Sequence, residues 1–141
     1  MKTKQCTKCG KQKLLSEFYK QKDGKYGVRG DCKKCNIKYS QRYANKQRRT
    51  IAGYLRHLFY CIKQRCDNSN YPKYKYWGGR GIKCKFRSAD EFVNYVINNL
   101  QIDPHGLTID RINNNGHYEP GNIRFVTIAE NNRNKTRKEP K

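Results

Sequence analysis

The chain has 141 residues, and its 32 Lys and Arg against 11 Asp and Glu give a formal net charge of +21 at pH 7. Only 35% of the residues are apolar, so any hydrophobic core must be modest and a further source of stability is expected. A chain this basic is attracted to polyanions, and nucleic acid is the expected partner. No segment approaches the roughly 20 apolar residues of a transmembrane helix, and the N-terminus lacks the apolar core of a signal peptide. These features argue against a membrane protein and favour a cytoplasmic location.

Four of the seven cysteines form two C-x2-C pairs that are 22 residues apart: Cys6, Cys9, Cys32 and Cys35. Each pair can supply two thiolates from a tight knuckle, and the intervening segment can close a tetrahedral zinc site. Gly10 suits the first knuckle, and Asp23 with Gly24 can reverse the chain between two short strands. Zinc is favoured over disulfides, and a structural zinc site contributes on the order of 10 kcal/mol to folding.

The head containing these cysteines resembles a known kind of zinc finger. The segments KQCTKCGKQKLLSEFY and DGKYGVRGDCKKC are similar to the N-terminal zinc fingers of phage HNH proteins and, more loosely, of recombination endonuclease VII-like proteins. The functional interpretation is a DNA-docking module, and the alternative is a folding staple whose lysines only aid solubility. The basic residues expected to contact DNA are Lys33, Lys34, Lys38, Arg42, Arg48, Arg49 and Arg80. For Arg80, a structural hydrogen-bonding role is slightly favoured over a phosphate contact.

Composition divides the chain into three zones. Residues 1–40 are predicted to form the zinc-binding module, residues 41–66 a basic helical linker, and residues 67–141 a zone rich in Tyr, Gly and Asn that ends in a disordered basic tail. The resemblance to HNH proteins implies that this last zone is the nuclease domain. The middle zone is expected to be an amphipathic helix because apolar residues recur in it at three- and four-residue spacing: Ile51, Leu55, Leu58 and Ile62.

The last zone predicts a helix, two strands and a final helix. Ser88 suits the N-cap of a helix that runs to Leu100. Two short β-like runs, 107–112 and 123–127, flank a loop rich in Asn and Gly, which indicates a hairpin. From Ile128 the residues favour a helix that fades into the charged tail. The predicted order is therefore strand, loop, strand, helix.

Asp110 lies near the end of the first predicted strand, and Asn131 lies on the following helix, 21 positions later. That separation suits two ligands that converge on one divalent ion. Carboxylate and amide oxygens are hard donors that favour Mg²⁺ or Mn²⁺. Taken alone, however, such a pair is more often a cap and a turn residue.

The surrounding residues strengthen the metal-site interpretation through a family resemblance. The segment LTIDRINNNGHYEPGNIRFVTIAENNRNK resembles the ββα-metal (HNH) motif of phage HNH and homing endonucleases, and IKQRCDNSNYPKYKYWGGRGIKC is similar to the stretch before it. The resemblance implies an α+β chain, with a zinc ribbon-like module and a ββα-metal core that cuts double-stranded DNA with one divalent ion. It assigns Asp110 and Asn131 as metal ligands and Asn122 as the residue that ties the loop.

Arg111 departs from the family pattern, because the general-base histidine usually stands at its position. An arginine cannot accept a proton from water at neutral pH, so the base is left unassigned. Asp-Arg is similar to the motif of some HNH-superfamily restriction enzymes and many phage relatives, and Arg111 is expected to grip the scissile phosphate. His117 is the favoured base, ahead of His105 and of Tyr76 and Tyr118, although each histidine is more simply a surface loop residue.

Other interpretations remain open. The chief rival is a catalytically inactive DNA-binding protein that keeps the HNH fold, and a third is an RNA-binding zinc-finger protein. The glycine-rich segment 77–81 lacks the flanking strand, helix and lysine of a nucleotide site, so no nucleotide cofactor is expected. Cys61, Cys66 and Cys84 are expected to be buried thiols, although His57 could complete a second zinc site with them. A palindromic target would require a homodimer, which the sequence does not decide.

Overall fold

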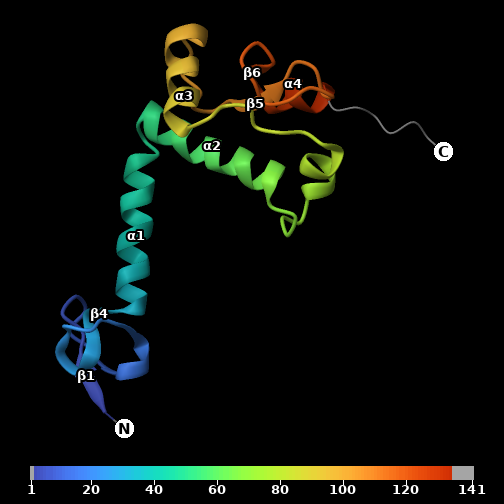
Figure 1. The fold of residues 1–141 in the computed structure, drawn as a ribbon. Helices are drawn as coiled ribbons and strands as arrows, with labels where there is room; N and C mark the ends of the chain where they lie inside the picture. Colours follow the sequence, from blue (N-terminus) through green and yellow to red (C-terminus); the bar gives the residue numbers. More distant parts are fainter. Residues whose placement is uncertain (1, 135–141) are drawn as a thin grey trace. The chain divides into compact units, whose positions relative to one another are not determined.

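The computed structural model describes residues 2–134 and divides the chain into two compact units, the first ending at Gln47 and the second beginning at Arg48 (Figure 1). Both units are small, and each sheet in them has two strands. The coarse prediction of an α+β chain is confirmed. The basic tail predicted to be disordered, 136–141, lies outside the described residues.

The first unit consists of two hairpins and one helix. Its elements are β1 (Thr3–Gln5), β2 (Gln12–Leu14), β3 (Phe18–Lys20), β4 (Val28–Cys32) and α1 (Lys33–Gln47). β1 pairs with β2 and β3 with β4, both antiparallel. Gly10 adopts a φ of +68° in the first knuckle, and a Cβ on Gly24 would come within 2.1 Å of the Val28 carbonyl oxygen. The two glycines therefore hold the turns that the sequence predicted for them.

Very few side chains are buried in the first unit. Its core consists of Phe18, Val28 and two of the zinc-motif cysteines, Cys6 and Cys32. None of the side chains of α1 is buried, and α1 carries no acidic residue. The predicted module boundary at residue 40 falls inside this helix, which continues to Gln47.

The second unit is built on α2 (Ile51–Asp67). Thr50 is the N-cap of this helix, and its hydroxyl accepts a hydrogen bond from the Gly53 amide at 3.1 Å. One face of α2 is buried in the core of the unit: Leu55, Phe59, Ile62 and Cys66. The predicted linker zone 41–66 is thus divided between two helices, and its second part belongs to a hydrophobic core. The amphipathic pattern was correct, but it did not reveal which part of the chain the apolar face would meet.

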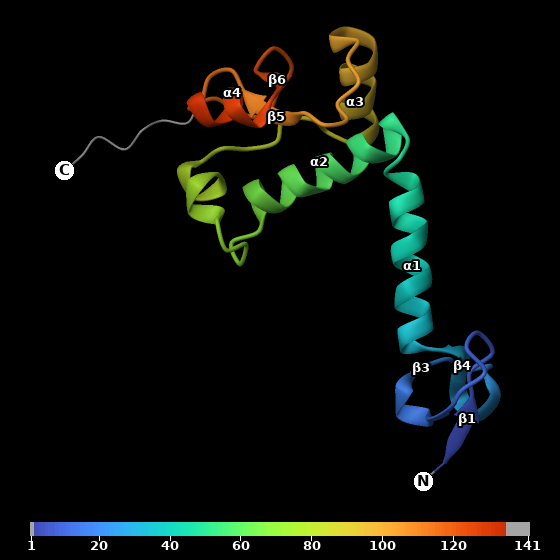
Figure 2. The ribbon, with the colours of Figure 1, turned by 180° about the vertical axis from the view of Figure 1, so that it is seen from behind.

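Two short 3-10 helices, Tyr74–Tyr76 and Gly78–Arg80, follow α2. The later elements of this unit are α3 (Ala89–Asn94), a π-helical extension (Tyr95–Leu100), β5 (Thr108–Arg111), β6 (Ile123–Val126) and α4 (Ile128–Arg133). α3 lies by the N-terminal half of α2 in both views, and Phe59 meets Phe92 there with ring centroids 6.1 Å apart (Figures 1 and 2). The predicted N-cap at Ser88 is confirmed, because its hydroxyl accepts from the Glu91 amide at 3.1 Å.

β5 and β6 form an antiparallel hairpin in which Asp110 is paired with Arg124. α4 follows directly and starts with a capping box, in which Thr127 and Glu130 each accept a hydrogen bond from the other's amide. The predicted order of strand, loop, strand and helix is therefore present. Within residues 2–134, no helix combines the length and apolar character that crossing a bilayer requires.

Candidate functional site

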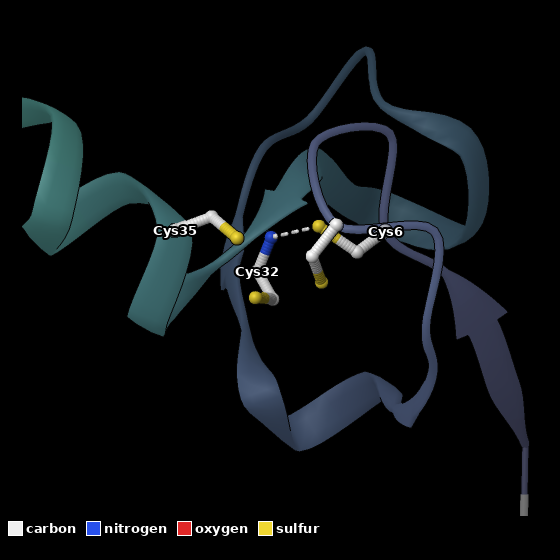
Figure 3. Close-up of side chains that lie close together, drawn as sticks. Cys6, Cys32 and Cys35 are labelled. Carbon is white, nitrogen blue, oxygen red and sulfur yellow. Dashed lines mark hydrogen bonds between the residues drawn. The ribbon is translucent and has the colours of Figure 1, made fainter.

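The four cysteines of the first unit converge. The Sγ atoms of Cys6, Cys9, Cys32 and Cys35 all lie within 4.8 Å of one another. Zinc–sulfur bonds of about 2.3 Å in a tetrahedron place the sulfurs roughly 3.8 Å apart, so the cluster is close to the size that the ion requires. Figure 3 shows the labelled sulfurs turned toward a common centre from the knuckle, the end of β4 and the start of α1. The cluster can therefore hold a metal ion such as zinc.

Backbone amides also point at these sulfurs. The amides of Cys32 and Lys8 donate to Cys6 Sγ at 3.3 and 3.4 Å. Burial opposes ionisation of Cys6, but these backbone hydrogen bonds outweigh it and lower the pKa of Cys6 to about 6. Hydrogen bonding to Cys32 and the other thiols raises the pKa of Cys35 to about 12. Four thiolates this close repel one another, so full ionisation requires a bound cation.

All seven predicted DNA-contacting residues are exposed: Lys33, Lys34, Lys38, Arg42, Arg48, Arg49 and Arg80. Arg48 Nη2 lies 3.3 Å from His57 Nδ1. Arg80 Nη2 donates to Asn115 Oδ1 at 2.7 Å, which supports the structural role that was favoured for it. The positive charge is thus available on the surface, and Arg80 in addition is hydrogen-bonded to the loop.

A cleft of about 620 Å³ in the second unit brings three of the predicted site residues together: Asp110, Arg111 and Asn131. One group of its lining residues, including Tyr54, Arg65 and Trp77, comes from α2 and the segment that follows it, and the other group comes mainly from β5 and α4. In both ribbon views β5 and α4 lie across from α2 (Figures 1 and 2). The hairpin register and the capping box bring Asp110 and Asn131 to the same wall, although they are 21 positions apart in sequence.

Asp110 is 6% exposed, and one of its two carboxylate oxygens is heavily engaged. Asp110 Oδ2 accepts from Arg124 Nε at 3.0 Å, from Arg124 Nη2 at 2.9 Å and from Asn134 Nδ2 at 2.8 Å. These contacts fix the carboxylate and orient it. The other oxygen, Oδ1, can coordinate a metal ion or accept a hydrogen bond from a group in the cleft.

The hydrogen bonds of Asn131 fix the orientation of its amide. Asn131 Nδ2 donates to Thr108 Oγ1 at 2.9 Å and to the Ile109 carbonyl oxygen at 3.2 Å. A carbonyl oxygen only accepts, so the NH₂ group must face the strand. The amide oxygen is consequently directed away from β5 and can serve as a hard donor.

Arg111 is also nearly buried, at 6% exposure, and is held in place from two sides. Its Nη1 donates to the Gly116 carbonyl oxygen at 2.8 Å, and its Cζ lies 5.2 Å from the centroid of the Tyr118 ring. Burial lowers the pKa of Arg111, but a guanidinium stays protonated at neutral pH. Arg111 is thus a fixed cation at the cleft, suited to binding an anionic oxygen.

Asn122 ties the loop between the strands through both ends of its amide. Its Oδ1 accepts from the Asn113 amide at 2.8 Å, and its Nδ2 donates to the carbonyl oxygens of Asn113 and His117 at 3.2 and 2.7 Å. A Cβ on Gly116 would approach Asn122 Nδ2 to 2.5 Å. Asn122 is therefore hydrogen-bonded to the backbone at two points of a close-packed loop.

The histidines considered as a general base do not line the cleft. His117 Nδ1 accepts from the Lys83 amide at 3.2 Å, and His105 Nδ1 lies 2.6 Å from Asp103 Oδ1. Of the tyrosines considered with them, Tyr118 lines the cleft but is 3% exposed, while Tyr76 is 45% exposed and lies outside it. The described cleft-lining residues thus include no histidine.

Sequence reasoning did not identify Arg124 and Asn134, which bind Asp110. The hairpin register would have indicated Arg124, because directly paired residues face the same side of a two-stranded sheet. For Asn134, which also donates to the Arg111 carbonyl oxygen at 2.8 Å, no sequence signal was evident. The opposite wall, which includes Tyr54, Arg65 and Trp77, was not identified as part of the site either.

The three remaining cysteines do not form a second metal site. Among the described residues, the zinc-motif cysteines are the one group of three or more His, Cys, Asp or Glu with metal-ligand spacing. Cys61 Sγ lies 3.6 Å from His57 Nε2, and burial raises the pKa of Cys66 to about 11. The expectation of buried thiols is therefore confirmed for Cys66, whereas Cys61 and Cys84 are only partly buried.

No protein-family model matches the chain, and no solved structure matches it. The chain is similar to an uncharacterized protein, L246, of Acanthamoeba polyphaga mimivirus, with 43% identity over 54 residues. This match covers 38% of the chain and spans 24% of the viral protein's length.

Proposed function

We propose that the protein is a DNA endonuclease of the HNH kind, which hydrolyses phosphodiester bonds of double-stranded DNA with one divalent ion. The observation that carries this proposal is the convergence of Asp110, Asn131 and Arg111 on one cleft of a strongly basic chain. A buried carboxylate oxygen, an oriented amide oxygen and a fixed guanidinium are the groups that phosphodiester hydrolysis needs beside one another.

The donor set fits a hard divalent ion such as Mg²⁺ or Mn²⁺. Asp110 Oδ1 and Asn131 Oδ1 are the oxygens that would hold it, and two protein ligands leave positions for phosphate oxygens and water. When bound, the ion would supply positive charge to the phosphate and to the departing 3′ oxygen. Arg124 and Asn134 keep the Asp110 carboxylate oriented through its other oxygen.

Arg111 has the role of binding the scissile phosphate. Its contacts with Gly116 and Tyr118 fix the guanidinium before the substrate arrives, so little side-chain entropy is lost on binding. Asn122 acts indirectly by holding the loop that contains Gly116. The zinc module would add affinity for the DNA backbone through its exposed cations, notably Lys33, Lys34 and Lys38.

The test is cleavage of supercoiled and linear plasmid by the zinc-loaded chain with added Mg²⁺ or Mn²⁺. Asp110→Asn and Asn131→Ala should each reduce cutting by more than about 100-fold, because each removes a ligand oxygen or its charge. The matched controls are Asp67→Asn and Asn98→Ala, which alter exposed residues outside the cleft. Equal loss of cutting in the controls would refute the assignment of this site.

A catalytically inactive DNA-binding protein is the second candidate. Two observations favour it: Arg124 neutralises the Asp110 carboxylate, and no histidine is among the described residues of the cleft. This candidate predicts tight, salt-sensitive DNA binding without cutting in either metal. An Arg124→Gln variant sharpens the distinction, because releasing Asp110 should raise metal affinity if the site is catalytic.

A further inference from the structure

The wall of the cleft opposite Asp110 has a composition that the proposed chemistry does not use. It carries Tyr54, Leu58, Arg65, Tyr71, Lys73 and Trp77, none of which is needed to hold a metal ion or the scissile phosphate. This wall is partly apolar and partly cationic. A ligand that matches it must combine a flat apolar surface with negative charge nearby.

Arg65 is the central feature of this wall. Its guanidinium Cζ lies 5.3 Å from the centroid of the Trp77 ring, and Tyr71 meets the same ring edge-on with centroids 6.4 Å apart. The side chains of Arg65, Tyr71 and Trp77 are all partly exposed. An arginine held over an aromatic ring is pre-oriented, and its planar group can accept a base on its free side.

The charges in the cleft favour a polyanion. Among the described lining residues, Asp110 is the one acidic side chain, whereas Arg65, Lys73 and Arg111 are cationic. Arg65 and Arg111 lie over Trp77 and Tyr118 at similar distances, 5.3 and 5.2 Å from the ring centroids. The cleft thus has two guanidiniums supported by aromatic rings, one on each wall.

We propose that this wall is a subsite for an unpaired nucleobase of the DNA strand whose phosphate is bound by Arg111. The base stacks on the guanidinium of Arg65, with Tyr71 beside it, while Lys73 neutralises a neighbouring phosphate. The inference rests on the proposed function only in taking that strand as the substrate. A base paired within a duplex has no free face to offer, so an unpaired nucleotide is bound preferentially.

Trp77 is the sole tryptophan of the chain, so its fluorescence reports on this wall. The zinc-loaded full chain is titrated, without added Mg²⁺ or Mn²⁺, with oligothymidylate and with a duplex carrying the same number of phosphates per strand. Binding is followed in parallel by fluorescence anisotropy of labelled DNA. Oligothymidylate is expected to change Trp77 emission, and the duplex to bind with a much smaller change.

Three variants separate stacking from simple charge. Arg65→Gln and Arg65→Lys should both weaken oligothymidylate binding about tenfold, because lysine keeps the charge but lacks the planar group. Tyr71→Ala should weaken binding by a similar factor and provides a second variant should Arg65 prove necessary for folding. The control is Arg56→Gln, which removes a charge on the same helix from an exposed pair with Asp90, outside the cleft.

Several results would overturn the subsite. These are full recovery of binding in Arg65→Lys, an equal loss in Arg56→Gln, an equal Trp77 response to duplex, and strong oligothymidylate binding that leaves Trp77 emission unchanged. The test is independent of catalysis. Binding as expected without plasmid cutting would retain the subsite and reject the nuclease, whereas cutting without this binding would do the reverse.

Discussion

The two units of the protein are stabilised in different ways. In the first unit, two of the four buried core side chains are cysteines of the metal-binding cluster, Cys6 and Cys32, and only Phe18 and Val28 complete that core. The second unit has a contiguous core to which α2, α3 and the β5–β6 hairpin all contribute. We therefore propose that metal coordination by the cysteine cluster stabilises the first unit, whereas apolar burial stabilises the second.

The two modes of stabilisation place different kinds of residues at the disposal of each unit. A metal-held unit needs few apolar residues, so most of its surface can carry cations, as the exposed helix α1 does. A unit with its own core can bury polar groups such as Asp110 and Arg111, because the surrounding packing and hydrogen bonds compensate for their desolvation. Within residues 2–134, the two buried charged side chains, Asp110 and Arg111, accordingly both lie in the second unit.

The largest effect is expected from abolishing metal binding by the cysteine cluster of the first unit. Cys32→Ser, or a strong zinc chelator, should unfold residues 2–47 because on the order of 10 kcal/mol of metal-binding free energy is lost. NMR spectra of the full chain should show collapse of the resonances of this unit alone. The control is Cys61→Ser, which alters a partly buried cysteine outside the cluster. Simultaneous loss of both units would contradict the division proposed here.

The next largest effect should fall on the second unit alone. Phe92 is fully buried and meets Phe86 with ring centroids 5.1 Å apart, so Phe92→Ala should reduce the free energy of unfolding by about 3–5 kcal/mol. Chemical denaturation followed by Trp77 fluorescence measures this, since Trp77 lies in the same unit. Zinc content should not change. Ile97→Ala, at a 41% exposed position, is the control and should have little effect.

Features fixed by local spacing were predictable from the sequence. The cysteine cluster follows from two C-x2-C pairs, the start of α3 from Ser88, and the loop contacts of Asn122 from the resemblance of its segment. Each depends on residues close in sequence or on a strict ligand geometry. Such signals can be recognised in the sequence without knowledge of the tertiary structure.

Features that depend on distant contacts were not predictable. The apolar stripe of α2 indicated a buried face but not that it would join α3 in one core instead of linking two modules. The pairing of Asp110 with Arg124 depends on the hairpin register. A shift of one residue would place the two side chains on opposite faces of the sheet. The wall of the cleft opposite Asp110 combines α2 with a segment of short 3-10 helices and turns. No periodic sequence pattern predicts the path of such a segment.

A smaller effect, confined to the site of the second unit, is expected from Asn122→Ala. The variant loses three hydrogen bonds to the loop and should cost about 1–3 kcal/mol of the free energy of unfolding. The Gly116 carbonyl oxygen of this loop also holds Arg111 Nη1, so the rate of cleavage should fall even under conditions in which the variant remains fully folded. Parallel denaturation and plasmid assays test this, with exposed Asn98→Ala as the control. A loss of stability without any loss of cutting would show that the loop does not position the residues of the site.

The smallest effect concerns the cap of α4, the helix that carries Asn131. Hydrogen bonds from the Thr127 hydroxyl, at 2.7 Å, and the Thr127 amide, at 2.9 Å, lower the pKa of Glu130 below its ordinary value of 4.5. The ionised carboxylate thus stabilises the folded state fully above pH 4.5, and this contribution is lost as the pH falls through the lowered pKa.

An NMR titration of the Glu130 carboxyl measures that lowered pKa directly. In Thr127→Ala, which should also cost about 1 kcal/mol through loss of the N-cap, the hydroxyl bond is gone and the titration midpoint should rise toward the ordinary value for glutamate. An unchanged midpoint would mean that the capping box does not form in solution. The orientation of Asn131 toward the cleft would then have to come from its bonds to β5 alone, because the start of α4 would no longer be fixed.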